Sequence, residues 1–388
     1  MSGHGGQPRQ TPLYDAHLRA GAKIIDFGGW LMPVSYPSGI IDEHRTTRTA
    51  VGIFDVSHMG EAHFRGPRAA EAVQRLITND LGKLQDGHAL YTVACFPTGG
   101  IVDDLIVYRI AADHFLIVVN AGNREKDLAW FREHVGSWCD VIDASDETAL
   151  IAFQGPRAAD ALQTLTAVPL SSLRSFDVVV DREVAGIRAS LARTGYTAED
   201  GFEIFCEANR ADALWNHLLE AAAAVGGKPV GLGARDTLRL EGRLSLYGNE
   251  LTDDTTPLEA GLGWVVKLDG AADFIGKAAL RDQQARGVTR KLVGFVMRGR
   301  GVARHGYAIH GTDAAGPVGT VTSGTYGPTI EKNIGMGYVP ETLATVGGTL
   351  VVDCRGKMIE AEIVSGPFYK RTNEPARVQP RVVKKGSP

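Results

Sequence analysis

Short apolar runs alternate along this chain of 388 residues with stretches of helical periodicity. Runs typical of strands, bounded by Gly, Pro or Asn turns, lie at 60–64, 89–96, 101–110 and 114–119. Stretches with a helical period lie at 211–224, 234–241 and 276–286. From about residue 290 to Tyr369 the pattern changes to short strands between many Gly turns, which is typical of a barrel or sandwich. We therefore predict a multi-domain α+β protein.

An internal repeat occurs in the first part of the chain. Residues 65–76 (RGPRAAEAVQRL) match 154–165 (QGPRAADALQTL) at eight of twelve positions. Each copy follows a strand-like run and opens a helix with Pro near its start, where a missing N–H costs nothing. This pattern predicts two related α+β subdomains within 1–285, a C-terminal β-barrel at 286–376 and a basic tail at 377–388. Chance similarity between two Gly-Pro helix starts is the alternative.

Composition and charge exclude several classes of protein. The net charge is −4, and no basic stripe suited to nucleic acid is visible. No apolar stretch approaches the roughly eighteen residues of a membrane span, and the N-terminus shows no targeting pattern. The four cysteines, at 95, 139, 206 and 354, have no short spacing and are expected to be free thiols in a reducing compartment. We expect a cytoplasmic protein without nucleic-acid or membrane partners.

Generic catalytic motifs are missing from the sequence. Gly231-Leu232-Gly233 lacks the third glycine of a dinucleotide-binding turn, and no nucleophile elbow or P-loop is found. His58 and His63 are not part of an HExxH pattern, so no metal site is predicted. Candidate chemistry must therefore come from polar residues embedded in apolar strands.

Asp103 and Asp104 are the first such residues. The runs on either side of residues 97–100 predict a hairpin, and pairing Phe96 with Ile101 sets its register. Both aspartates then lie within an apolar strand, where an unpaired carboxylate is costly. Capping of a neighbouring turn and contact with a ligand are equally good explanations for Asp103.

Asp104 has the better case for a ligand contact. In this register Val93 opposes Asp104 and Tyr91 opposes Ile106, so Tyr91, Asp104, Ile106 and Tyr108 share one face of the strands. A shift of one residue would place Tyr91 with the other aspartate instead.

A second hairpin is predicted with Asp200-Gly201 as its turn. In that register Ala198 opposes Glu203 and Tyr196 opposes Phe205, which puts Tyr196 and Glu203 on one face. A carboxylate beside aromatic rings could accept hydrogen bonds from a flat heterocycle with N–H groups. An exposed Glu on a solvated sheet face is the alternative.

Arg235 and Arg239 lie four residues apart on the predicted helix that follows residues 231–233. An Arg at the start of that helix could hold a carboxylate or phosphate. An ion pair with a neighbouring Asp or Glu on the helix is an equally good explanation.

Together with further segments of the chain, these motifs resemble the T-protein family of the glycine cleavage system. The resemblance runs from about residue 11 to 371 in the family's order. The matching segments are 11–14, 54–59, 99–105, 119–121, 193–197, 231–236, 246–250, 323–325 and 332–339. Three positions depart from the family pattern: Ala198 replaces a glycine, Gly242-Arg243 replaces Ala-Gly, and Tyr326-Gly327-Pro328 replaces Phe-Ser-Pro.

The resemblance implies a cloverleaf of three domains around a central folate cavity. It also implies an aminomethyltransferase whose substrate is carried on the lipoyl arm of H-protein. The family releases ammonia, passes the methylene to tetrahydrofolate as co-substrate and leaves dihydrolipoyl H-protein. No metal is implied, and the setting is a bacterial-type cytoplasm.

Residue roles follow from the same resemblance. Asp104 would be the catalytic carboxylate facing the reacting nitrogens of folate. Glu203 would hold the pterin edge with Tyr196 and Arg235 beside it, and Arg371 would reach the folate tail. The other residues expected at the folate site are Met59, Tyr91, Asp103, Ile106, Tyr108 and Asn120.

Two other functions are possible on this fold. A folate-dependent demethylase of a small methylated amine or sulfur compound would use the same Asp and Glu. A non-catalytic folate-binding factor of iron–sulfur assembly carries a Lys-Gly-Cys-Tyr motif near residues 274–277, and this chain has no Cys between 206 and 354.

Overall fold

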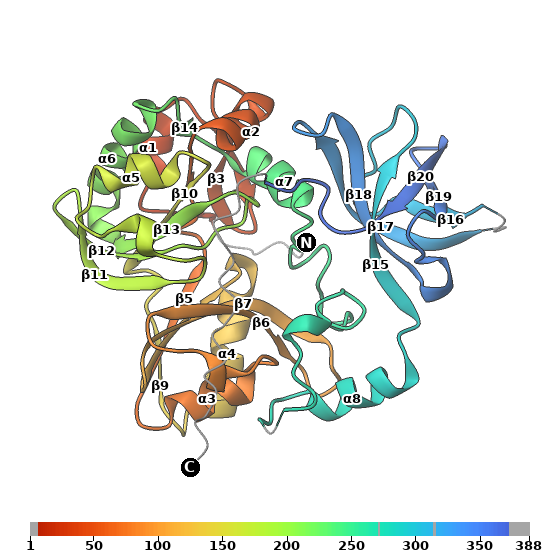
Figure 1. Ribbon diagram of the computed structural model, residues 1–388, viewed down its shortest axis with the longest axis horizontal. Helices are drawn as coiled ribbons and strands as arrows, with labels where there is room; N and C mark the ends of the chain where they lie inside the picture. The colour runs from red at the N-terminus through yellow and green to blue at the C-terminus, as the bar shows by residue number, and fades with distance from the viewer. Residues whose placement is uncertain (1–6, 271, 313–315, 372–388) are drawn as a thin grey trace, which may run out of the picture.

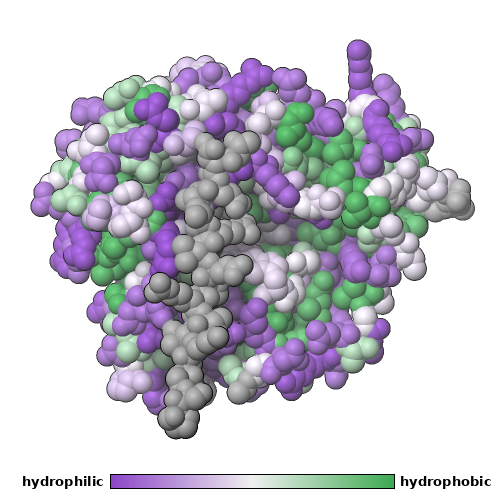
Figure 2. Space-filling model, viewed as in Figure 1, coloured by the Kyte–Doolittle hydropathy of each residue, from purple (hydrophilic) through white to green (hydrophobic). Residues whose placement is uncertain are grey.

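Three lobes make up the protein, and Figure 1 shows them around a common centre. The computed structural model describes residues 7–270, 272–312 and 316–371, so the basic tail predicted at 377–388 lies outside the described residues. None of the helices in these ranges is long and apolar enough to cross a membrane. The face seen in Figure 2 is largely polar, with apolar groups interspersed.

The first lobe is built on a six-stranded sheet in the order β11-β12-β13-β10-β4-β14. Its strands are β4 (Gly52–Asp55), β10 (Thr148–Gln154), β11 (Val178–Val184), β12 (Ile187–Ala192), β13 (Gly201–Glu207) and β14 (Lys228–Pro229). A small sheet of β1 (Arg9–Gln10), β2 (Lys23–Phe27) and β3 (Trp30–Ser35) adjoins it. The helices of this lobe are α1 (Tyr14–Arg19), α2 (Ile40–Thr49), α5 (Ala158–Gln163), α6 (Ala211–Ala223) and α7 (Leu232–Glu241).

The second lobe contains a five-stranded sheet in the order β6-β7-β8-β5-β9. Its strands are β5 (Gly60–Arg65), β6 (His88–Cys95), β7 (Ile101–Ala111), β8 (His114–Val119) and β9 (Asp140–Asp143). Helices α3 (Ala69–Leu76) and α4 (Arg124–Val135) accompany this sheet. The two large sheets meet in a shared apolar core, where the ring of Tyr108 from β7 packs edge-on against Phe205 from β13 at 5.6 Å.

The third lobe is a closed six-stranded barrel in the order β15-β18-β17-β16-β19-β20. Its strands are β15 (Arg290–Met297), β16 (Ala308–Gly311), β17 (Pro317–Gly327), β18 (Lys332–Pro340), β19 (Thr349–Asp353) and β20 (Met358–Val364). Helix α8 (Lys277–Arg286) precedes the barrel. The predicted α+β class with a C-terminal barrel is confirmed.

Helix α7 joins the first lobe to the barrel through a buried arginine. Arg239 pairs with buried Glu250 at 2.8 Å and donates to the hydroxyl of Ser323 on β17 at 2.7 Å. Arg239 also pairs with Asp236, three residues earlier on α7, at 2.8 Å. The ion pair expected on the helix is therefore present at Arg239. Breaking a buried pair is strongly destabilising because it leaves an uncompensated charge.

The two copies of the sequence repeat have the same local structure. Each begins with a Gly-Pro turn and continues into a short helix, α3 or α5. Near the end of each helix a glutamine, Gln74 or Gln163, donates from its amide to the carbonyls three and five residues further on. Its amide oxygen accepts from the backbone N–H seven residues further on. The same side chain thus fixes the chain's exit from both helices.

Candidate functional site

The hairpin that carries Asp104 has the predicted register at its functional end. Val93 pairs with Asp104 and Tyr91 pairs with Ile106, as expected from the sequence. The hydroxyl of Tyr91 donates to Oδ2 of Asp104 at 3.1 Å, which confirms that the two side chains share a face.

At the turn, the predicted pairing of Phe96 with Ile101 is wrong by one residue. Cys95 pairs with Ile101, because the N–H of Phe96 donates to the carbonyl of Gly100 at 2.8 Å. This bond closes the turn with Gly99 at a φ of +89°, a conformation that glycine adopts without strain. A bulge beside Cys95 absorbs the extra residue and leaves the rest of the strand in register.

Asp103 lies on the opposite face and is fully buried. Its carboxylate accepts from the backbone N–H of Asn120 at 2.9 Å and from the side-chain amides of Asn120 and Asn123 at 2.8 and 2.7 Å. These contacts cap the turn that enters α4. The amide of Asn120 also donates to Oδ1 of Asp104 at 2.8 Å, so Asp103 positions a residue that in turn holds Asp104.

Asp104 is therefore a half-buried carboxyl with a second carboxylate, that of Asp103, behind it. Burial raises its pKa to about 7, and the charge of Asp103 adds to the shift. Hydrogen bonds from Tyr91 and Asn120 act in the opposite direction. Burial and the charge of Asp103 also raise the pKa of nearby Asp127 well above its usual range. A carboxyl that changes charge near neutral pH is typical of a functional group.

The rate should follow the ionisation of Asp104 if its charged form is the active one. The charged fraction grows as pH rises through the pKa of about 7, so kcat should be level above that pH. Well below it, kcat should fall about tenfold for each pH unit. Residual turnover of Asp104→Asn should lack this dependence, and melting curves at each pH would show that both proteins remain folded. A wild-type rate that is flat from about pH 5.5 to 8 would contradict this expectation.

A second hairpin is present, formed by β12 and β13, but its predicted turn and register are wrong. Asp200-Gly201 does not form a two-residue turn, and residues 193–200 make a loop between β12 and β13. Glu203 accordingly lies between Ala192 of β12 and Ala152 of β10, and Ala198 is not its cross-strand partner.

Two interactions stabilise the loop in place of the tight turn. Arg193 closes it with two hydrogen bonds to Asp200, at 2.6 and 3.0 Å. The buried amide of Gln154 fills it, donating to the carbonyls of Thr194 and Phe202 at 3.0 and 3.2 Å. Arg193 and Asp200 pair across the whole loop, and Gln154 comes from a strand about forty residues earlier. The local Asp-Gly turn signal was misleading because neither interaction is local.

The loop nevertheless brings its polar residues to one place. The Oε2 of Glu203 accepts from the hydroxyl of Thr194 at 2.5 Å and from that of Tyr108 at 3.3 Å. The guanidinium of Arg235 lies 4.7 Å from the ring centre of Tyr196. Burial lowers the pKa of Arg235, whereas the nearby oxygens of Tyr196 and Glu203 favour its charge. Tyr196 and Glu203 thus meet around Arg235 rather than across a strand pair.

Several buried polar atoms around this cluster have no hydrogen-bond partner within the ranges that the structure describes. They are Nη1 of Arg235, Nδ1 of His58 and both carboxyl oxygens of Glu61. Burial lowers the pKa of His58 to about 4 and raises that of Glu61 well above its usual range. Unsatisfied buried groups are rare and costly, so this arrangement favours a polar ligand that supplies the missing partners.

The remaining predicted residues border the same region. Met59 and Ile106 pack, half-buried, against the core between the two sheets. Arg371 lies 3.7 Å from Asp200, at the loop that carries Tyr196. All the predicted site residues are half-buried except Asp103 and Tyr108, which are buried.

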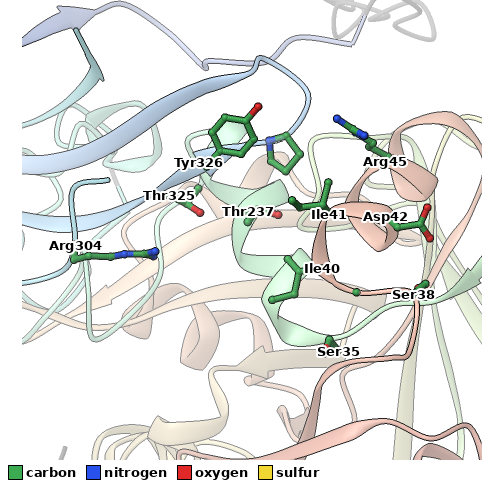
Figure 3. A pocket seen from close by; sticks show the side chains of 12 residues that line it. Ser35, Ser38, Ile40, Ile41, Asp42, Arg45, Thr237, Arg304, Thr325 and Tyr326 are labelled. Carbon is green, nitrogen blue, oxygen red and sulfur yellow. The ribbon is translucent and has the colours of Figure 1, made fainter. Parts of the chain in front are cut away.

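A separate cavity of about 710 Å³ opens between α2 and the barrel (Figure 3). Ile40 and Ile41 of α2 face Thr325 and Tyr326 of β17 across it, with Arg304 at the barrel side. None of the predicted site residues lines this cavity, so it is distinct from the Asp104 region.

Some residues of the site were not predicted from the sequence. Thr194 donates to Glu203 and Asn123 donates to Asp103. His58 and Glu61 carry buried atoms without partners among the described residues. Thr194 and His58 lie within segments that match the family, 193–197 and 54–59. The sequence therefore pointed to these segments but not to the roles of the two residues. Trp264, which stacks on Tyr91, gave no sequence signal because its exposure depends on tertiary structure.

Ala198 lies beside Gly242, where the loop at 193–200 approaches the end of α7. Ala198 has a φ of +61°, and a Cβ placed on Gly242 would stand 2.7 Å from the Ala198 methyl. The family pattern has glycine at the first position and alanine at the second. In this chain the methyl group is therefore on residue 198 and not on residue 242.

Exchanging the residues at positions 198 and 242 should show whether the two positions compensate each other. Gly242→Ala alone should destabilise the protein by about 1–3 kcal/mol through overpacking. Ala198→Gly removes the left-handed strain of a non-glycine residue, roughly 1 kcal/mol. The double variant should recover at least wild-type stability, measured by urea unfolding. Additive losses in the double variant would show that the two positions do not interact.

Comparisons with known proteins agree with this architecture. The family described as "GCVT N-terminal domain" matches residues 13–270, and the "Glycine cleavage T-protein C-terminal barrel domain" matches 290–370. An aminomethyltransferase of Anoxybacillus flavithermus is 48% identical over 364 residues, covering 94% of this chain and 99% of the relative. One from Bacillus subtilis is 45% identical over 94% of this chain and 99% of its own length.

A solved structure extends the agreement to the whole fold. The glycine cleavage system aminomethyltransferase T of Bartonella henselae superposes with a TM-score of 0.86 at 36% identity. The match covers 93% of this chain and 98% of that one. Fold and site together define a three-lobed α+β transferase with a C-terminal barrel. The chain belongs to the glycine cleavage T-protein family, and the predicted function as an aminomethyltransferase is confirmed.

Proposed function

We propose that this protein takes the aminomethyl group carried on the lipoyl arm of H-protein, releases ammonia and passes the methylene to tetrahydrofolate. The reaction leaves dihydrolipoyl H-protein and takes place in the cytoplasm. The four cysteines are free thiols, in keeping with a reducing compartment.

The observation that carries the proposal is the fixed carboxyl of Asp104. Tyr91 and Asn120 hold its two oxygens, at 3.1 and 2.8 Å, on strand β7 of the second lobe. Positive charge develops on the aminomethyl carbon as its bond to the leaving ammonia breaks. A preoriented carboxylate in a region of low dielectric stabilises that charge without reorganising.

The residues around Glu203 suit the pterin of tetrahydrofolate. Such a ring presents N–H donors along one edge and a carbonyl and ring nitrogens on others. The carboxylate of Glu203 can accept from the donors, and the free Nη1 of Arg235 can donate to an acceptor. Tetrahydrofolate supplies the amine that accepts the methylene. Arg371, beside Asp200, is suited to the carboxylates of the folate tail.

The direct test uses purified protein with aminomethylated H-protein and tetrahydrofolate. Ammonia release and methylenetetrahydrofolate should appear in equal amounts, and omission of either substrate should abolish the second product. Failure of the wild-type protein with H-protein, together with turnover of a small methylated amine or sulfur compound, would favour a demethylase. Folate binding without any turnover would favour a non-catalytic folate-binding protein.

A further inference from the structure

Trp264 is an exposed aromatic residue attached to the Asp104 site. It lies in the 3-10 turn η5 (Gly263–Val265), and 61% of it is accessible to solvent. Its ring stacks on that of Tyr91, with centroids 5.8 Å apart and planes inclined by 23°. Because the hydroxyl of Tyr91 donates to Asp104, two rings connect the surface with the carboxyl.

The turn that presents Trp264 is held firmly. Val265 is fully buried, and its carbonyl accepts from the hydroxyl of Thr78 at 3.2 Å. The N–H of Lys267 donates to the carbonyl of Thr78 at 2.9 Å. The ring is therefore presented on a rigid turn. A rigid, exposed indole offers a large apolar contact area at little entropic cost, which is typical of binding surfaces.

The two sides of the site differ in chemistry. Around Glu203 and Arg235, Nη1 of Arg235 and Nδ1 of His58 have no partner among the described residues and can hydrogen-bond the edge of a pterin. Tyr91 and Trp264 instead present stacked aromatic rings with apolar faces. A lipoyl arm is a saturated chain that ends in two sulfur atoms, and both methylenes and sulfur pack well on aromatic rings. The aromatic side therefore suits the arm better than it suits the folate ring.

We propose that Trp264, stacked on Tyr91 at the edge of the folate site, forms the outer wall of the subsite for the lipoyl arm. The proposal rests on the proposed aminomethyltransfer from H-protein. It assigns to Trp264 a contact with the substrate arm and no step in the chemistry.

Steady-state kinetics of Trp264→Ala and Trp264→Phe test the assignment. Loss of the indole should raise KM for aminomethylated H-protein by about tenfold or more, while KM for tetrahydrofolate changes less than about twofold. Phe should recover part of the loss. The reverse reaction with free dihydrolipoamide, ammonia and methylenetetrahydrofolate should show the same increase in KM, because the contact is with the arm. Met358→Ala, a similarly exposed apolar residue on the barrel, should change neither constant.

The outcomes separate the inference from the function on which it rests. A wild-type protein inactive with H-protein overturns both. An active wild type whose Trp264→Ala variant keeps its KM for H-protein overturns the subsite alone. A rise confined to KM for tetrahydrofolate would place the folate benzoyl group on this ring and also overturn it. Stabilisation of the variant by tetrahydrofolate in a melting experiment shows that the variant is folded.

Discussion

Asp104→Asn should lower kcat by about 10²-fold or more while the protein stays folded. The amide keeps the shape of the side chain and can still accept from Tyr91, but it carries no negative charge. A charge needed only as the aminomethyl carbon becomes positive affects kcat rather than KM. Single-turnover rates of methylenetetrahydrofolate formation would measure the loss directly.

Asp103→Asn should behave differently and serves as the comparison. Asp103 accepts three hydrogen bonds within the turn that enters α4. Its loss should cost about 2–4 kcal/mol of stability and lower kcat less than the change at Asp104. Asp113→Asn, at an exposed position after β7, should change neither property. A larger kcat loss for Asp103→Asn would show that Asp103, not Asp104, is the catalytic aspartate. Small and equal losses would show that neither is catalytic.

The face shared by Tyr91 and Asp104 could be predicted because strand periodicity is local and strict. Two apolar runs and one turn were enough to place four side chains on one side of a sheet. The error at Cys95 did not spread, since a bulge returned the strands to the expected pairing. The barrel could be predicted for a similar reason, because short strands between glycine turns leave no room for helices.

The loop at 193–200 could not be predicted, because its stability is not local. Asp-Gly is a strong turn signal, yet the amide of Gln154, from a strand forty residues earlier, occupies the space that a tight turn would close. The unpartnered atoms of His58 and Glu61 also depend on the approach of two sheets. Resemblance to a family supplied the residues of this cluster, and their contacts came only from the structure.

Glu203 and Arg235 also show why the site is costly to the free protein. The cluster holds a half-buried carboxylate, a half-buried guanidinium and, within the described residues, several buried polar atoms without partners. Each unsatisfied group disfavours the folded state by about 1–3 kcal/mol. A ligand that completes these bonds should therefore stabilise the protein strongly.

Glu203→Ala should remove most of the stabilisation that tetrahydrofolate gives. At a ligand concentration of about 100 Kd, wild-type protein gains roughly 2.7 kcal/mol, which raises its Tm. Losing charge-assisted hydrogen bonds to the pterin should weaken binding by about 100-fold, so the same concentration should give almost no shift. Glu207→Ala, an exposed change on the same strand, should retain the full shift. Without ligand, the variant should melt within a few degrees of wild type, because within the described residues the carboxylate of Glu203 accepts two hydrogen bonds, from Thr194 and Tyr108. A Glu203→Ala protein whose Tm still rises as in wild type would place the pterin elsewhere between the lobes.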